Sequence, residues 1–435
     1  MAIPRKIRPG WLVYVVLFAA LAGIGVTFVA LKLPTRVPPG AVSGGQPPEP
    51  VVLPRLNVGA LPTTVPYPAR PASCKPKSLA GANGTWFPDW LDNPQLPSTV
   101  PAVADSLNLV NFDWLGVGRS PTDILYQPSD PGGPTLADQL QTADSANPCA
   151  WRMVTVSDVG TPMSVMARIL VDPKSRWAHV MALAQVMAAE PQGEGLTLDY
   201  EFSLPNSVSD LATYAAVAGW HNISPRDEIG YLTTDYTELV RELAVAMHHE
   251  HRLLSVAVEV RETNELTYWD ISYASPFLYD YGAIASYADQ IVFMATDFHY
   301  STSDPGPIVP TDDLKRVFQV MGSYNIPRDK LAIEVPNYGY DWPVTRTGAL
   351  VPGAQATPVT ATTLANSHWL RTGTQGAGTS YEYSSSGQRH IVWFADLGAE
   401  VRELGTLCPG CTLAAWSDAN SDPVGSQLIT RILGG

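Results

Sequence analysis

The sequence predicts a (β/α)8 barrel with a small α+β insertion between its seventh and eighth strands, preceded by a transmembrane helix and a Pro-rich linker. Three features of the 435-residue chain predict this: eight short apolar runs separated by helix-period segments, one long interval before the last run, and an N-terminal region of different composition. Alternating strands and helices indicate parallel βαβ units, and eight such units close a barrel.

The N-terminal region predicts a membrane anchor. Residues 11–31 form a run of 21 residues without a charge, which at about 1.5 Å per residue is long enough to cross a hydrocarbon core of about 30 Å. Arg5, Lys6 and Arg8 precede this run, so residues 1–10 are expected in the cytoplasm and the C-terminal domain outside a single-pass anchor in the cell membrane. A cleaved signal peptide is the alternative, although its apolar core is usually shorter.

Residues 32–78 are predicted to form an extended linker. Eleven prolines lie between Pro34 and Pro71, with Gly and Ser among them and little apolar periodicity. Such a segment cannot bury a core and forms a semi-rigid spacer of about 3.1 Å per residue. The barrel domain is then expected over residues 79–435.

The apolar runs are the predicted barrel strands. They occupy residues 84–87, 107–114, 152–157, 195–201, 254–260, 290–297, 330–336 and 412–416. Amphipathic segments at residues 174–190, 237–251 and 312–324 predict helices between them. The inserted subdomain is expected within residues 343–411, where residues 379–383 and 390–394 flank a turn at 384–387 and predict a hairpin.

The negative net charge of the chain argues against nucleic acid as a partner. The formal net charge is −14, and the first 36 residues carry five basic side chains and no acid, so the remainder is more acidic still. Such a surface repels phosphate backbones, and no nucleic-acid partner is expected.

The four cysteines favour two disulfides beyond a membrane, Cys74–Cys149 and Cys408–Cys411. A redox pair or half of a zinc site is the alternative for the second pair. Neither a second CxxC nor a thioredoxin-like strand accompanies it in the sequence. The run 248–251, His-His-Glu-His, lacks the H-E-x-x-H spacing, so no metal site is predicted there.

The candidate chemistry lies in residues 194–201. Because side chains alternate along a strand, Thr197, Asp199 and Glu201 share the face that points into a barrel, while residues 196, 198 and 200 pack under helices. Two carboxylates at the C-terminal end of an inner strand lie where barrel enzymes hold their catalysts. They are about 6.6 Å apart along the strand, so one ionised group raises the pKa of the other and keeps Glu201 protonated, as a general acid requires. The two acids alone would fit solvent contacts or a salt bridge at a strand end.

In its wider context this segment resembles DGxDxDxE, the fourth-strand signature of family 18 glycoside hydrolases, and looks most like their bacterial spore-cortex and cell-wall N-acetylglucosaminidase branch. The resemblance runs from about Gly84 to Pro423. Residues 254–258 resemble the fifth strand, 279–281 and 288–299 the helix and sixth strand ending in MxYD, 335–342 the seventh-strand VPxYGYDW, and 390–396 and 414–416 the insertion and eighth strand.

The resemblance implies substrate-assisted hydrolysis with retained configuration and no cofactor, because the acetamido group of the substrate supplies the nucleophile. Glu201 would protonate the leaving glycosidic oxygen, Asp199 and Asp297 would hold the acetamido group, and Trp416 would form the floor under the sugar. Further candidates for substrate binding are Tyr338, Tyr340, Thr197, Trp86 and Asp113; Asp158, like Asp113, follows a predicted strand and is a further candidate to line the pocket.

Three positions depart from the family pattern. Glu194 and Thr197 stand at the first and middle Asp of the signature, and Thr296 stands at the Tyr of MxYD. The last change removes a hydroxyl expected on the acetamide, although Tyr338 or Tyr340 could reach the same region.

The sequence as a whole predicts an exported, membrane-anchored β-N-acetylhexosaminidase. The anchor, the spacer and the resemblance favour peptidoglycan as its substrate, with chitin second. A glycan-binding barrel with negligible turnover is the main alternative, which Thr197 and Thr296 favour and the retained Asp199 and Glu201 oppose. A surface scaffold that binds a protein is a third.

Overall fold

The computed structural model describes residues 70–75, 78–88, 96–126, 134–264, 275–416 and 422–434. The predicted transmembrane segment, residues 11–31, and most of the Pro-rich linker lie outside these ranges. Within them, no helix has the length and apolar character needed to cross a bilayer.

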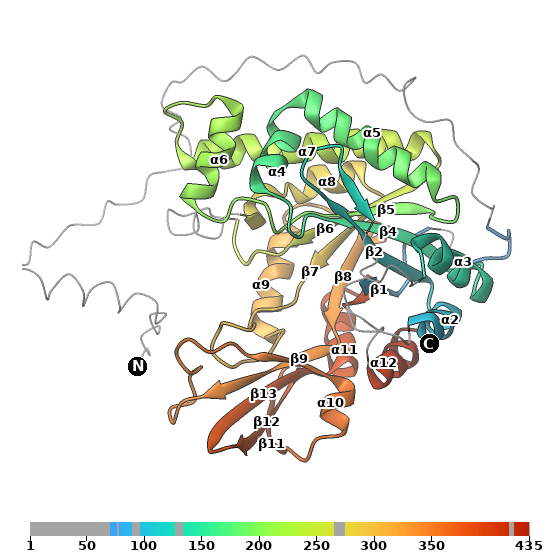
Figure 1. The fold of residues 1–435 in the computed structure, drawn as a ribbon. Helices are drawn as coiled ribbons and strands as arrows, with labels where there is room; N and C mark the ends of the chain where they lie inside the picture. The colour runs from blue at the N-terminus through green and yellow to red at the C-terminus, as the bar shows by residue number, and fades with distance from the viewer. Residues whose placement is uncertain are drawn as a thin grey trace, which may run out of the picture. The chain divides into compact units, whose positions relative to one another are not determined.

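Eight parallel strands form a closed barrel (Figure 1). In order around the barrel they are β1 (Gly84–Pro88), β2 (Leu109–Val117), β4 (Trp151–Ser157), β5 (Gly195–Asp199), β6 (Leu253–Glu259), β7 (Gln290–Met294), β8 (Leu331–Pro336) and β14 (Thr412–Trp416). Pairing of β14 with β1 closes the barrel, and β3 (Ile124–Tyr126) adds an antiparallel pairing at the end of β2. The strands fall on the eight apolar runs, and the predicted barrel is confirmed.

Helices cover the outside of the barrel. They are α2 (Leu96–Ser106), α3 (Leu136–Ala146), α4 (Met163–Val171), α5 (Pro173–Ala189), α6 (Val208–Ala218), α7 (Pro225–His249), α8 (Tyr281–Tyr287), α9 (Thr311–Gly322), α11 (Leu397–Leu407) and α12 (Pro423–Leu433). The structure starts α7 well before the predicted residue 237, because the Ser224 side chain caps the helix and Pro225 occupies its first turn.

A second sheet lies between β8 and β14 in the sequence. It consists of β9 (Tyr338–Val344), β10 (Thr357–Thr360), β11 (Leu370–Gln375), β12 (Gly378–Ser385) and β13 (Gln388–Ala395), with the short helix α10 (Ala361–Ala365). Its strands are antiparallel, in the order β10-β9-β13-β12-β11, and Figure 1 draws the sheet beside the barrel in orange and red. The sheet begins at Tyr338 rather than at residue 343, because only Asn337 separates β8 from β9.

The predicted hairpin is the pair β12–β13. Ser386 and Gly387 form its turn with φ of 52° and 82°. Two residues in the left-handed region give the two-residue turn that matches the twist of antiparallel strands.

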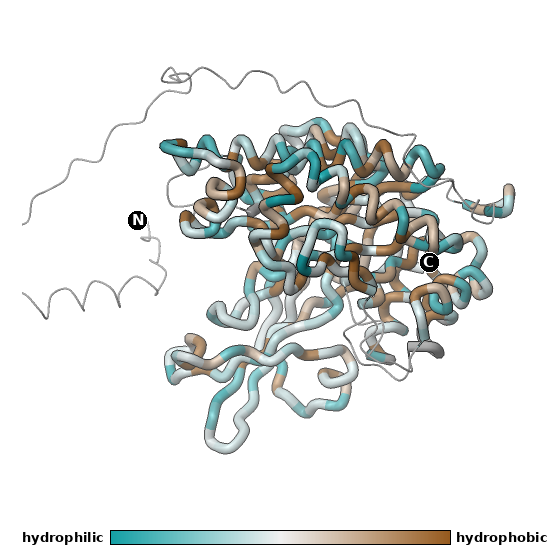
Figure 2. The backbone as a smooth tube through the Cα atoms, turned by 45° about the horizontal axis from the view of Figure 1, so that its top comes forward, coloured by the Kyte–Doolittle hydropathy of each residue, from teal (hydrophilic) through white to brown (hydrophobic). Residues whose placement is uncertain are grey.

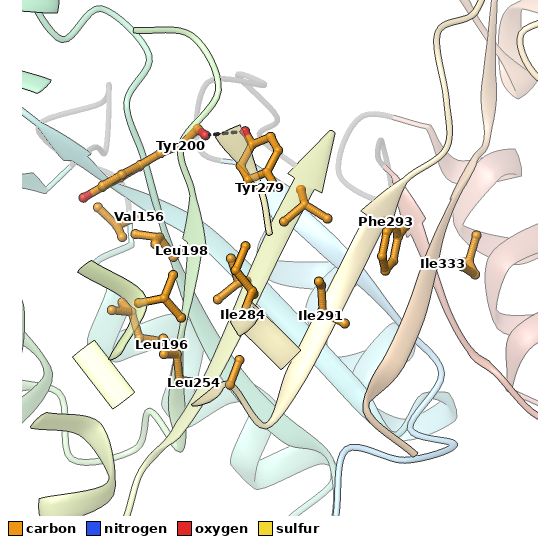
Figure 3. Packing of buried hydrophobic residues seen from close by; sticks show 14 of the residues in the cluster. Val156, Leu196, Leu198, Tyr200, Leu254, Tyr279, Ile284, Ile291, Phe293 and Ile333 are labelled. Carbon is orange, nitrogen blue, oxygen red and sulfur yellow. Dashed lines mark hydrogen bonds between the residues drawn. The ribbon is translucent and has the colours of Figure 1, made fainter. Parts of the chain in front are cut away.

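The main core lies between the barrel strands and the helices. Leu196, Leu198 and Tyr200 are fully buried there, and Figure 3 shows Tyr279 donating a hydrogen bond of 2.8 Å from its hydroxyl to the Tyr200 carbonyl. In Figure 2 hydrophobic residues concentrate in the barrel and its helices, whereas the inserted sheet is mostly pale or teal. The alternation predicted for β5 therefore holds on its outer face.

The barrel interior contains a layer of mostly small apolar side chains near its C-terminal end. Ala257, Val292, Ala332 and Ala414 pack with Trp86 beneath the C-terminal end of the barrel. Small side chains in this layer leave space above them. That space is the cavity that opens at the ends of the strands.

Two disulfides join cysteines of the described chain. Cys74, ahead of β1, is bonded to Cys149 just before β4, and Cys408 is bonded to Cys411 between α11 and β14. The first bond holds the segment that enters the barrel against the barrel itself.

Candidate active site

A cavity of about 240 Å³ opens at the C-terminal ends of the barrel strands. Residues on or just after β1, β5, β6, β7, β8 and β14 line it. Five predicted residues are among them: Asp199, Glu201, Asp297, Trp86 and Trp416. The structure thus brings together side chains that are far apart in the sequence.

Asp199 and Glu201 occupy one side of this cavity. Asp199 ends β5, and its Oδ1 is buried without a hydrogen-bond partner among the described residues. Burial, with the charges of Asp158 and Glu259, raises the pKa of Asp199 to about 7. Burial, followed by the charges of Asp199 and Glu259, raises the pKa of Glu201 well above its usual range. The raised pKa favours the protonated form of Glu201, the form that a general acid requires.

Asp158 fixes the backbone that carries Glu201. Its Oδ1 accepts hydrogen bonds of 3.0 Å from the N–H groups of Glu201 and Phe202, and its Oδ2 accepts one of 2.7 Å from Ser203. Asp158 is fully buried and is not among the residues that line the cavity, contrary to the expectation from its position after a strand. Asp158 affects the cavity indirectly, because it fixes the backbone of residues 201–203.

Asp297 follows β7 and faces the inserted sheet. Its Oδ1 accepts a hydrogen bond of 2.9 Å from the Tyr338 hydroxyl, and its Oδ2 one of 3.4 Å from Tyr340. Burial raises the pKa of Asp297 to about 6, and the two tyrosine hydrogen bonds act in the opposite direction. Its φ of 54° lies in the left-handed region, a strained backbone that is often found at functional sites. Because both tyrosines belong to β9, the insertion helps to build the site.

Aromatic side chains form another part of the wall. Trp86 and Trp416 meet edge to face with ring centroids 6.1 Å apart. Phe202 also lines the cavity and is 59% exposed, so it offers an open ring at the rim. The sequence interpretation missed Phe202, although an aromatic residue directly after the candidate acid was a usable signal.

Four predicted substrate-binding residues lie outside the cavity lining: Tyr338, Tyr340, Thr197 and Asp113. The two tyrosines act on the cavity through their hydrogen bonds to Asp297. The Thr197 hydroxyl accepts a hydrogen bond of 3.0 Å from Asn111, whose side-chain oxygen accepts one of 2.7 Å from Thr155. This buried polar chain links three neighbouring barrel strands, β2, β4 and β5. Asp113 is buried on β2 and does not line the cavity either. The alternation of side chains along a strand turns both Thr197 and Asp113 into the barrel. It does not specify how far along the barrel axis each one lies, and that position keeps both out of the cavity lining.

Two carboxyl groups of the cavity were missed. Glu259 ends β6, and Glu334 lies within β8 with 5% of its surface exposed. The available signal was a carboxylate inside, or at the end of, an apolar strand. Glu194, which stands at the first Asp of the signature, lies at the opposite end of β5 and pairs with Arg152 and Arg70.

The described residues contain no group of three or more His, Cys, Asp or Glu side chains suited to a metal ion. In the histidine-rich run at the end of α7, His248 Nε2 lies 2.8 Å from Asp289 Oδ2. That hydrogen bond raises the pKa of His248. The contact accounts for His248 without a ligand.

Comparison with known proteins adds an independent observation. Residues 166–397 match the family model "Glycosyl hydrolases family 18". The Bacillus subtilis (strain 168) protein named "Putative sporulation-specific glycosylase YdhD" is 25% identical over 289 residues, which cover 62% of this chain and 58% of that protein. The chain thus spans less than two thirds of that relative, and smaller shares of two further B. subtilis proteins that it matches.

Two solved structures share the fold. The Bacillus cereus spore cortex-lytic enzyme SleL has a TM-score of 0.61 and 16% identity, covering 80% of this chain and 73% of that one. A chitinase from Cycas revoluta in complex with (GlcNAc)3 has a TM-score of 0.61 and 19% identity, covering 81% of this chain and 98% of that one. Since the family model covers more than half of the sequence, the chain belongs to family 18 of the glycosyl hydrolases.

Proposed function

We propose that this protein is a glycoside hydrolase that cleaves β-linked N-acetylhexosamine polymers by substrate-assisted, retaining catalysis. One observation carries the proposal: in a family 18 barrel, the acid Glu201 and the carboxylate Asp199 line the same open cavity at the C-terminal ends of the strands. That is where barrel enzymes hold their catalytic groups.

Each group has a distinct role in the first step. Glu201 donates its proton to the glycosidic oxygen while the bond from that oxygen to the anomeric carbon breaks. The carbonyl oxygen of the acetamido group forms the new bond to the same carbon. Asp199 accepts the acetamido N–H at its buried Oδ1, which lacks another partner among the described residues, and so orients the carbonyl.

The second step returns the proton. Water attacks the anomeric carbon from the side of the departed sugar, giving a proton to the Glu201 carboxylate, and the bond to the acetamido oxygen breaks. Asp199 and Glu201 project from one strand end and cannot flank both faces of a sugar ring. A nucleophile supplied by the substrate fits this geometry better than the two-carboxylate scheme.

Peptidoglycan is the favoured polymer, with chitin second. The support is the N-terminal sequence, in which an apolar segment and a Pro-rich spacer would place the barrel outside the cell membrane and near the wall. Two similar proteins carry names that refer to sporulation and to spore cortex lysis, and those names describe those proteins.

A second candidate function is glycan binding with negligible turnover. Thr296 lines the cavity at the position where the family pattern has a tyrosine, and this change favours the candidate. The raised pKa of Glu201 opposes it, because a binding site needs no proton donor at this position.

The test is digestion of purified peptidoglycan and of chitooligosaccharides by the protein and by Glu201→Gln, with analysis of the new reducing ends. Glutamine has a similar shape but cannot transfer the proton, so we expect the rate to fall by about 10²–10⁴-fold. N-acetylglucosamine at the new reducing ends of peptidoglycan would support the wall assignment. Equal trace activity of the two proteins on both polymers would identify a binder.

A further inference from the structure

The mechanism leaves Glu334 without a role, although it lines the same cavity. It lies on β8, where it is paired with Ala414 of β14, and the preceding inward residue on its own strand is Ala332. The residues beside and beneath it on β14 and β8 are therefore small and apolar. A carboxyl group at such a position loses its hydration, which is unfavourable unless another polar group replaces the water.

The protein itself offers Glu334 little compensation. The Thr296 hydroxyl donates a hydrogen bond to its Oε1 at 3.5 Å, the outer limit for such a contact. Burial raises the pKa of Glu334 well above its usual range, and the charges of Asp199 and Asp297 raise it further. The raised pKa favours the protonated form of Glu334, which can donate a hydrogen bond into the cavity that it lines.

The neighbours of Glu334 indicate which part of a ligand it meets. Asp199 and Asp297 are the carboxyl groups that the proposed mechanism uses to hold the acetamido group, and both act electrostatically on Glu334. Thr296, one residue before Asp297, completes this side of the cavity. A threonine at position 296 also leaves room for a ligand group that a larger side chain would occupy.

We propose that the Glu334 carboxyl, positioned by the Thr296 hydroxyl, binds the N-acetyl group of the sugar in the cavity by donating a hydrogen bond to its carbonyl oxygen. The proposal rests on the proposed function, whose acetamido group it uses. It makes Glu334 a substrate-binding residue that selects for N-acetylated sugars.

The test measures binding without turnover. In the full-length Glu201→Gln protein, calorimetry gives the affinity for N,N′,N″-triacetylchitotriose and for the same trimer without acetyl groups. Added Glu334→Ala should weaken binding of the acetylated trimer by at least about tenfold. Glu334→Gln keeps an N–H donor and should stay within about threefold of the parent. The affinity for the deacetylated trimer should change little in either variant.

Two further variants separate recognition from folding. Glu242→Gln alters a buried carboxyl of α7 that does not line the cavity, and it should leave both affinities unchanged. Thr296→Tyr added to Glu334→Ala supplies a new hydroxyl on this side and should recover part of the lost affinity. If the alanine variant does not fold, Glu334→Met, of similar length, takes its place.

The outcomes distinguish the two proposals. Undiminished binding of the acetylated trimer by the alanine or methionine variant would overturn the role of Glu334 alone. An equal loss for both trimers would do the same, because the effect would not involve the acetyl groups. No binding of either trimer by the parent would overturn the proposed function as well.

Discussion

Five carboxyl groups, from Asp199, Glu201, Glu259, Asp297 and Glu334, line a single small cavity. Burial raises the pKa of Asp199 to about 7 and that of Asp297 to about 6. A raised pKa means that the folded protein binds a proton more tightly than the unfolded chain does. The free energy of unfolding therefore falls as pH rises, because these carboxyl groups must lose their protons while buried. Active sites commonly lower the stability of the fold in this way.

Asp199→Asn tests this relation. The stabilising effect of the bound proton is fully present below the unfolded pKa near 4 and is lost as pH rises through about 7. We expect the asparagine variant to be more stable than the wild type at pH 8, by at least about 1 kcal/mol, and similar to it at pH 4. Denaturant unfolding at the two pH values measures the difference.

The matched control is Asp312→Asn, whose carboxyl is 85% exposed at the start of α9. It should not reproduce the gain in stability at pH 8 that is expected of Asp199→Asn. A stability difference between Asp199→Asn and the wild type that is the same at both pH values would contradict the proton linkage.

At the scale of elements, the end of β5 and the loop after it form a unit with Asp158. Three backbone N–H groups of residues 201–203 donate to this one buried carboxylate. The strand places Asp199, but it ends there, so Glu201 depends on the loop. Small displacements of a proton donor have large effects on rate.

Replacing Asp158 by alanine should lower kcat by at least about tenfold while KM changes less, because the acid moves and the binding walls remain. Asp158→Asn retains an oxygen for two of the three N–H groups and should recover part of the rate. Steady-state kinetics on a chitooligosaccharide measure both constants. A loss confined to KM, or equal losses in the two variants after correction for unfolded protein, would contradict this positioning role.

Much of the arrangement of strands can be predicted from the periodicity of the sequence. The eight strands and the alternation that turns Asp199 and Glu201 inward while Leu196, Leu198 and Tyr200 turn outward are local properties of the chain. The start of α7 was missed because the cap and proline that begin it precede the strongly amphipathic part. The position of each inward side chain along the barrel axis could not be predicted either, so Thr197 and Asp113 were wrongly expected to line the cavity.

At the scale of the whole molecule, sequence patterns do not reveal which residues that are far apart in the chain come into contact at the site. The hydrogen bonds from Tyr338 and Tyr340 to Asp297 join an inserted strand to the end of a barrel strand. Glu334 reaches Thr296 from the neighbouring strand. Such contacts depend on the sheet register, on side-chain conformations and on the twist of the insertion, and local propensity encodes none of these.

The disulfide Cys74–Cys149 acts at the scale of the whole molecule because it closes a loop with a sequence separation of 75. Replacing both cysteines by serine should lower the free energy of unfolding by about 4 kcal/mol, since the unfolded chain regains the entropy of that loop. The same change at Cys408 and Cys411, with a separation of 3, should lower it by only about 2 kcal/mol. Denaturant titration of the two variants without reductant measures the difference, and a larger effect at the short loop would contradict it.

The inserted sheet is attached to the barrel by very short connections. Asn337 alone separates β8 from β9, and Asp396 alone separates β13 from α11. The Asn337 N–H donates to the Trp416 carbonyl at 2.9 Å, and the Asp396 N–H donates to the Ala377 carbonyl at 2.7 Å. The first bond ties the β8–β9 connection to the neighbouring barrel strand β14, and the second ties Asp396 to the turn before β12. Tyr338 directly follows the β8–β9 connection, so we expect Tyr338 and Tyr340 to keep their hydrogen bonds to Asp297 when a polymer enters, and the substrate must fit a site whose width does not adjust to it.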